Sequence, residues 1–328
     1  MCQTRNNTID IFRLFFAFCV VCIHVPLLGA GKMIPVFRCA VPFFYMVSGY
    51  FLMSNNIELK LENNFKKWIK LWLKYFIIIG IVSILLHSFY KESIVFSRHD
   101  IIEILLYDGN TLSMDHIVIN GESTGLYTIW FLLCGAYSFL FYYFYKRYLG
   151  NRFIMLIVIF IFLFGITLIL EGFHVSRFVY LSIPYIGLGM LVRKYQNKVC
   201  GHNKMTKVMI LALLCGTYLE FHFANLHGVS LETTILSPFL MFLVVLEMTK
   251  CNLQSKFAQQ VASVGRSTTL EIYIYHRPVY ALLLAITPPS QYYIYHNFGA
   301  IIVFIFTLSL VILCHKIISF IPINDHKR

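Results

Sequence analysis

Residues 9–29, IDIFRLFFAFCVVCIHVPLLG, already indicate what kind of molecule this chain is. A helix of about 20 mostly apolar residues is long enough to cross the ~30 Å hydrocarbon layer of a bilayer. This one also carries an arginine and a histidine, which are costly at bilayer depth and in most proteins are retained there for a function. The stretch therefore predicts a membrane-spanning helix that takes part in a site.

The composition of the whole chain leads to the same class. Of its 328 residues, 59% are hydrophobic and 13% are charged, whereas soluble domains are about 45–50% apolar and about 25% charged. This difference indicates a polytopic membrane protein and excludes a disordered chain, a coiled coil and a disulfide-stapled secreted module. The nine cysteines lie mostly in apolar runs, as small buried hydrophobic residues do.

Apolar runs of spanning length occur ten times, with no internal repeat and no Pro/Ser-rich linker between them. We therefore expect one domain, residues 1–328, that is all-α and forms a bundle of about ten transmembrane helices. No small-residue cleavage site follows the first run, so we expect a retained anchor rather than a cleaved signal peptide. The expected spans are 9–29, 36–53, 69–89, 125–145, 153–171, 177–193, 206–224, 233–249, 269–287 and 298–320.

The positive charges predict how these spans are oriented. With the N-terminus inside, twenty of the 27 Lys and Arg residues fall in cytoplasmic segments and four in outer segments, the asymmetry that the positive-inside rule describes. We therefore expect both termini inside and a multi-pass protein of the cell (inner or plasma) membrane. The topology accounts for most of the net charge of +12, so no nucleic-acid partner is expected. The longest outer segment, 90–124, contains an amphipathic stretch at 100–106 that could lie on the surface or form a lid.

Three polar residues of the first span share one helix face. Arg13 and His24 are eleven residues apart, close to three turns, so both side chains leave the same side of the helix, about 16 Å apart in depth. Asp10 lies one turn before Arg13. Snorkelling, or an interfacial histidine with satisfied hydrogen bonds, would explain each residue alone. Together the three favour a functional face.

The second span begins with another arginine, near the outer edge of the membrane. Arg38 is followed by CAVPFFYMVSGYFL, residues 39–52. Pro42 removes one backbone hydrogen bond early in this helix, and the Ser48-Gly49 pair permits another helix to approach closely. Taken alone, Arg38 could equally be an interfacial anchor.

These features together resemble the membrane acyltransferase-3 family. In the first span, ten residues separate Arg13 from His24. This pair is followed in the second span by Arg38 and the stretch VPFFYMVSGYFL, residues 41–52. Residues 263–276, SVGRSTTLEIYIYH, resemble the family's Gly…Ser-x-x-Ile-Tyr-x-x-His ending, and residues 126–132, LYTIWFL, resemble its central Leu-Trp-Phe-Leu stretch. Thr128 stands where the family often has a histidine, two residues before that tryptophan.

The resemblance implies an O-acyltransferase that moves an acyl group, commonly acetyl, from cytoplasmic acyl-CoA to a hydroxyl of a surface or cell-envelope glycan. It also implies no metal and no permanently bound cofactor, because acyl-CoA is the donor substrate. The chain has no P-loop, dinucleotide-binding, HExxH or GxSxG motif. The resemblance leaves open which glycan accepts the group and how the chain oligomerises.

The resemblance also implies roles near the outer face. His24 is expected to be the general base, since a neutral imidazole suits proton transfer at neutral pH. An acyl-histidine intermediate is the alternative. Arg38, at similar depth, is expected to position the acceptor or to stabilise negative charge on the oxygen. Further residues expected to contact substrates are Asp10, Ser48, Trp130 and Tyr273.

The polyanionic end of the donor is expected to dock at the inner face, because guanidinium groups pair well with phosphates. His276 enters its span from the inside, so we expect it nearer to Arg13 than to His24, in the donor channel or hydrogen-bonded to Tyr273. The residues expected at the donor are Arg13, Arg266, His276 and Arg277.

Two other classes of protein remain open. A transporter or exporter of a polysaccharide precursor or small solute would also carry buried charges among its spans. A membrane module that handles an amino acid is the other class, because resistance-type serine racemases carry a related membrane domain. Those racemases have an additional soluble domain, which is not expected here because the chain ends at Arg328.

Overall fold

The computed structural model of the protein describes most of the chain. The described residues are 6–53, 56–90, 126–150, 181–197, 204–227 and 234–320, with the short pieces 118–119, 122–123, 152 and 159. They are helical except for some short connections and one antiparallel pair of two-residue strands, β1 (Val118–Ile119) and β2 (Glu122–Ser123). The predicted helical class is confirmed.

The helices correspond to most of the predicted spans. Predicted span 153–171, most of the outer segment 90–124 and the amphipathic stretch 100–106 lie outside the described residues. The helix bounds are α1 (Asn7–His24), α2 (Ala30–Phe37), α3 (Ala40–Leu52), α4 (Ile57–Tyr90), α6 (Trp130–Leu149), α8 (Ile183–Tyr195), α9 (Lys204–Leu226), α10 (Ser237–Lys250), α11 (Lys256–Ile286) and α12 (Tyr292–Phe320), with the 3-10 turns η2 (Leu126–Ile129) and η4 (Pro289–Gln291).

Five helices in the described part of the chain are long and apolar enough to cross a membrane. They correspond to the first, second, third, seventh and tenth predicted spans, and they indicate a membrane protein. The count of ten spans and the inside position of both termini stay predictions. The five segments are Asn7–His24, Ala30–Leu52, Ile57–Leu85, Lys204–Leu226 and Tyr292–Ile317.

The second predicted span, 36–53, comprises the end of α2 and the whole of α3. The chain turns at Arg38 and Cys39, between α2 and α3. Pro42 explains the turn, because a proline ring clashes with the carbonyl group four residues before it, here that of Arg38. The predicted span is nevertheless present, because Ala30–Leu52 as a whole is long and apolar enough to cross a membrane, and Pro42 lies early in α3 as predicted.

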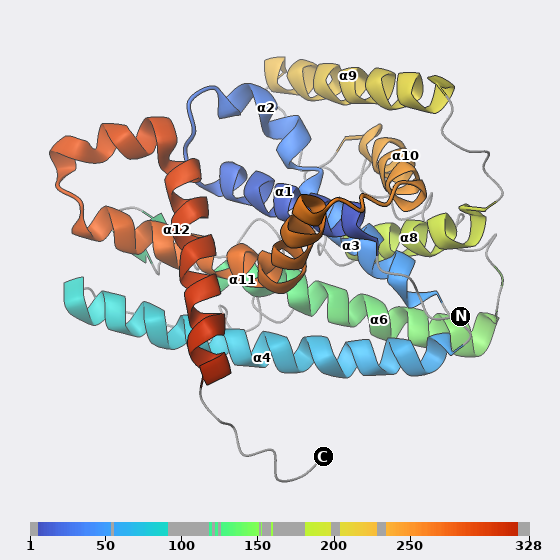
Figure 1. Cartoon of the computed structure of the whole chain (residues 1–328), viewed down its shortest axis with the longest axis horizontal. Coiled ribbons are helices and arrows are strands. Elements are labelled where there is room, and N and C mark those ends of the chain that lie inside the picture. The colour runs from blue at the N-terminus through green and yellow to red at the C-terminus, as the bar shows by residue number, and fades with distance from the viewer. Residues whose placement is uncertain are drawn as a thin grey trace, which may run out of the picture.

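Helices α1 and α11 pack side by side near the centre of the bundle (Figure 1). Gly265 makes this approach possible, because a Cβ atom there would lie 2.1 Å from the carbonyl oxygen of Asp10. The crossing of α3 and α8 depends on Gly49 in the same way, since its Cβ would lie 2.0 Å from the carbonyl oxygen of Ile186. The predicted role of Gly49 in close helix approach is confirmed.

Helices α4 and α6 lie next to each other along the lower edge of the bundle in Figure 1. Their contact includes Trp68 of α4, whose indole occupies the space beside Gly135 of α6. A Cβ at Gly135 would lie 2.1 Å from the Cζ3 atom of that indole. The absence of a side chain at Gly135 thus lets a large aromatic residue sit between the two helices.

Candidate functional site

At one end of the α1–α11 pair, the carboxylate of Asp10 bridges two arginines. Nη1 of Arg13 lies 2.7 Å from one oxygen, and Nε of Arg266 lies 3.0 Å from the other. The Asp10 side chain is 6% exposed, whereas the two arginines are 27% and 32% exposed. Because each guanidinium has five N–H donors, the bridge holds both groups in place while donors remain for a ligand. We call these three residues the Asp10 clamp.

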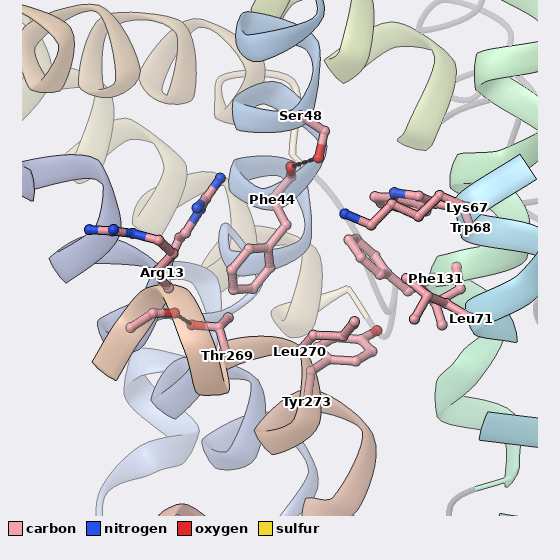
Figure 2. A pocket seen from close by; sticks show the side chains of 13 residues that line it. Arg13, Phe44, Ser48, Lys67, Trp68, Leu71, Phe131, Thr269, Leu270 and Tyr273 are labelled. Atoms are coloured by element: carbon pink, nitrogen blue, oxygen red, sulfur yellow. Dashed lines mark hydrogen bonds between the residues drawn. The ribbon is translucent and has the colours of Figure 1, made fainter. Parts of the chain in front are cut away.

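The two arginines of the clamp line a pocket with a volume of about 250 Å³. Lys67 of α4 reaches toward the same space from the side opposite Arg13 (Figure 2). Three cations against one carboxylate give the pocket an excess of positive charge, which suits an anionic ligand. The other lining residues are mostly apolar or aromatic: Phe44, Ser48, Trp68, Leu71, Phe131, Leu132, Gly265, Thr269, Leu270 and Tyr273.

The aromatic wall of this pocket is held by ring contacts around Phe131. Its ring stacks on Tyr45 with centroids 4.5 Å apart, and it lies 5.1 Å from the ring of Tyr273 and 5.4 Å from that of Trp68. The hydroxyl of Tyr45 also donates a hydrogen bond of 3.0 Å to the carbonyl oxygen of Phe131. Rings from four helices therefore form a fixed apolar surface beside the cations.

At the other end of the α1–α11 pair, two histidines lie next to each other. The ring centroids of His24 and His276 are 5.4 Å apart. His276 is fully buried, and its Nδ1 lies 2.7 Å from the carbonyl oxygen of Tyr273. Because a carbonyl only accepts, Nδ1 carries the proton and a neutral His276 has its lone pair on Nε2. That Nε2 has no hydrogen-bond partner among the described residues.

Arg277 ties the same end of the pair together. Its Nη1 donates a hydrogen bond of 2.8 Å to the carbonyl oxygen of His24, the last residue of α1. A cation at a helix C-terminus interacts favourably with the unpaired carbonyl groups there. Since Arg266 lies beside Asp10 and Arg277 beside His24, the two helices run in the same direction.

Tyr273 connects the two ends. Its side chain lines the pocket, and its ring centroid is 6.3 Å from that of His276, one turn further along α11. The pocket and the histidine pair are therefore neighbours, and a ligand that extends from the cations past Tyr273 would approach the imidazoles.

The chain was compared with known proteins. A family model described as an acyltransferase domain matches residues 6–316. The chain belongs to the acyltransferase-3 family. An amino-acid racemase from Enterococcus faecalis is 40% identical over 90 residues, which make up 25% of this chain and 13% of the racemase. No solved structure matches the chain.

Membership of the acyltransferase-3 family supports acyltransferase activity, and the site described above lies within the matched range. The residues predicted from the sequence fall into groups within it. Arg13, Ser48, Arg266 and Tyr273 line the pocket. Asp10 bridges the two arginines, so the structure uses its carboxylate as their counter-ion. His24, His276 and Arg277 gather at the other end.

The predicted depth of His276 is wrong, since its ring lies beside His24 and not near Arg13. Arg277, expected with the donor cations, also lies at the His24 end. The reason is the length of α11, which begins at Lys256 and not near residue 269 as the predicted span did. His276 is therefore about twenty residues into its helix, far from the Asp10 clamp. The predicted hydrogen bond between His276 and Tyr273 is present, through the carbonyl group of Tyr273.

Two further predicted residues, Arg38 and Trp130, do not line the pocket. The guanidinium carbon of Arg38 lies 5.7 Å from the ring centroid of Phe221 on α9, an arrangement typical of a cation–π contact. Trp130 is buried at the start of α6 and meets Phe131 edge-on at 6.4 Å between centroids. Trp130 therefore contacts Phe131 of the pocket wall without lining the pocket itself.

Sequence reasoning did not find several lining residues of the acyltransferase-3 pocket. Lys67 and Trp68 belong to a lysine-rich stretch whose charges were interpreted as orientation signals. Their neighbour Lys66 does not line the pocket; it is exposed and pairs with Glu62 at 2.5 Å. Phe44 lies within the second-span motif, and its position there was the signal that could have found it.

Proposed function

We propose that this acyltransferase-3 protein transfers an acyl group, most simply acetyl, from acyl-CoA to a hydroxyl of a surface or cell-envelope glycan, at the cell (inner or plasma) membrane. One observation carries the proposal: a pocket of three cations and aromatic walls lies one helical turn from a pair of histidines. Acyl-CoA has a matching construction, with phosphates at one end and an uncharged arm that ends in a thioester at the other.

The donor would bind with its phosphates at Arg13, Arg266 and Lys67, since charge-assisted hydrogen bonds to phosphate are among the strongest that a protein makes. A pocket of about 250 Å³ holds only part of such a molecule. The rest of the nucleotide would lie along the lysine-rich first half of α4. The arm would pass Tyr273 and bring the thioester to the His24 end.

At the His24 end, His24 would take the proton of the acceptor hydroxyl as its oxygen attacks the thioester carbonyl. A C–O bond forms, the C–S bond breaks, and the proton held by His24 passes to the departing CoA sulfur. His276 would orient the ring of His24, and Arg277 would fix the backbone that carries it. Arg38 would position the acceptor or stabilise the oxyanion.

The experiment uses membrane vesicles from cells that make the protein, supplied with acetyl-CoA labelled in the acetyl group. Label in the glycan fraction is the readout, in vesicles of both orientations. His24→Ala should lower the rate by about 100-fold or more, the usual contribution of a general base, while labelled acetyl-CoA still binds. His222→Ala is the matched control, because His222 is exposed on α9.

Equal labelling by wild type and His24→Ala would overturn the assignment of the base. No labelling by the wild-type protein in either orientation, at matched protein levels, would overturn acyl-CoA as the donor.

A second candidate rests on the matching segment of the racemase, a protein named for its action on amino acids. In this reading the chain presents or moves an amino acid across the membrane. Proteoliposomes would then take up labelled serine without any need for acyl-CoA. Binding of acetyl-CoA without uptake of serine or of a sugar precursor favours the acyltransferase over this candidate and over an exporter.

A further inference from the structure

A second cavity, with a volume of about 390 Å³, lies between α4, α11 and α12. It lies on the other side of α11 from the pocket that the Asp10 clamp lines, which is called the donor pocket below. The donor pocket uses residues such as Arg266 and Tyr273, whereas this cavity uses Glu271, Tyr275 and Leu282. At 100° per residue, these two sets face opposite sides of the helix. No step of the proposed acyl transfer involves this cavity.

The polar groups of the cavity gather at one end. Glu271 accepts a hydrogen bond of 3.3 Å from the hydroxyl of Tyr75, and Nε2 of His315 lies 3.7 Å from the same oxygen. Lys74, the neighbour of Tyr75, also lines the cavity. Three helices therefore bring a cation, a carboxylate, a phenol and an imidazole to one place, on the side of the cavity nearer the Asp10 clamp.

The other end of the cavity is apolar. Along α4 the lining continues from Lys74 to Val82, along α11 from Glu271 to Leu282, and along α12 from His315 back to Leu310. Because the cavity keeps this gradient on all three helices, it fits an amphiphile with a charged head and an apolar tail.

The surroundings indicate that the occupant comes from the bilayer. Beside the cavity, α4 exposes Ile77 (58%) and Ile81 (52%), and α12 exposes Leu313 (54%) and Ile317 (52%). In a membrane-spanning helix such side chains face lipid. The cavity thus lies between two lipid-facing helix surfaces.

The charges favour one class of lipid. Lys74 can pair with a phosphate. Glu271 can accept from an ammonium group, since a carboxylate has room for about four hydrogen bonds and Tyr75 takes one. One cation and one anion give no net preference for an anionic headgroup. We propose that this cavity binds one zwitterionic phospholipid with a primary ammonium group, its head at Lys74 and Glu271 and one acyl chain between Val82, Leu282 and Leu310.

The test measures bound lipid and does not involve acyl-CoA, so its result is independent of the proposed function. Purified protein is exchanged into nanodiscs with a photoactivatable phosphatidylethanolamine, or with its phosphatidylglycerol analogue, and crosslinked peptides are identified. The wild-type protein should crosslink at the cavity residues of α11 or α12, with the ethanolamine lipid preferred. Glu271→Gln should lower that preference about tenfold, the value of one charge-assisted hydrogen bond.

Val82→Trp fills the apolar end and should abolish crosslinking in the cavity. Ile77→Trp adds the same bulk on the exposed face of the same helix, and it should keep the crosslinks. Equal crosslinking by the two tryptophan variants, each checked for an unchanged melting temperature, would overturn the site. Equal capture of both lipids by the wild-type protein would overturn the headgroup assignment. If Val82→Trp does not fold, Leu310→Trp serves in its place.

Discussion

The two ends of the α1–α11 pair differ in how far their basic side chains are exposed and in what those side chains pair with. At the Asp10 clamp, two arginines share one carboxylate and remain about a third exposed, at the edge of a pocket. At the other end, His276 is wholly buried against His24, and its Nδ1 bonds to a backbone carbonyl group. Exposed fixed charge is suited to binding an anion, and a buried imidazole is suited to handling a proton. Under the proposed function, the Asp10 clamp would bind the donor and the histidine end would carry the chemistry.

The largest expected effect comes from crowding the close contact between α1 and α11 at Gly265. Gly265→Ala places a Cβ against the carbonyl oxygen of Asp10, so α11 must shift away from α1. We expect a loss of about 1–3 kcal/mol of stability, as in overpacked cores, and a fall of about 100-fold in activity from misplaced groups. Thermal unfolding and acyl transfer are measured together.

Gly80→Ala on α4 is the control for this substitution, because a Cβ there would meet nothing within 4 Å. Its stability should be equal to or greater than that of the wild type, since alanine has the higher helix propensity. Similar losses in both variants would show that the α1–α11 contact is not special.

The second effect addresses the Asp10 clamp alone. Arg13→Ala should raise the KM for acetyl-CoA about 10- to 100-fold, because one or two charge-assisted hydrogen bonds to phosphate are lost. Arg13→Lys should recover part of the loss, and kcat should change little. Lys207→Ala is the matched control, since Lys207 is exposed on α9 and does not line the pocket.

Kinetics with varied donor and varied acceptor check this prediction. If Arg13→Lys weakens the use of donor and acceptor equally, the clamp does not serve the donor.

The third effect addresses the histidine end. His276→Phe keeps a ring of similar size beside His24 but removes both nitrogens. We expect kcat to fall about tenfold, the upper value of one neutral hydrogen bond, with the KM for acetyl-CoA unchanged. His276→Ala should behave in the same way if proton handling matters, whereas wild-type turnover by the phenylalanine variant alone would assign His276 to packing.

The smallest effect concerns the edge of the pocket. The hydroxyl of Ser48 donates a hydrogen bond of 2.8 Å to the carbonyl oxygen of Phe44 in its own helix. Its contribution to a ligand is therefore small, and Ser48→Ala should raise the KM for acetyl-CoA by no more than about threefold. A loss as large as that of Arg13→Ala would show that Ser48 binds the donor directly.

Much of the site could be predicted because helical spacing is regular. The interval between Arg13 and His24 predicted one shared face, and in the structure both residues face the region of α11. The role of Gly49 was predicted for the same reason, since small residues permit close helix packing. The second span was predicted from its apolar pattern, but the turn at Arg38 and Cys39, where Pro42 clashes with the carbonyl group of Arg38, was not.

What could not be predicted depends on contacts between distant parts of the chain. Asp10 meets Arg266 across 256 positions, and Arg277 meets the backbone of His24 across 253. Helix periodicity gives the face on which a side chain lies but not the helix against which that face packs. Lys67 and Trp68 were missed for this reason, because their place in the pocket depends on how α4 packs against α6 and α11.

The sequence alone determined the membrane class, the helical fold, the acyltransferase-3 resemblance and the order of charged groups along the first span. These follow from local hydrophobicity, helix spacing and motif, which the chain carries whatever its neighbours are. Only the tertiary structure decided that Asp10 is a counter-ion, that His276 lies beside His24, and that two separate cavities flank α11. The reason is physical: the depth of a side chain depends on where its helix begins, and its partners depend on which helices meet closely at a glycine such as Gly265.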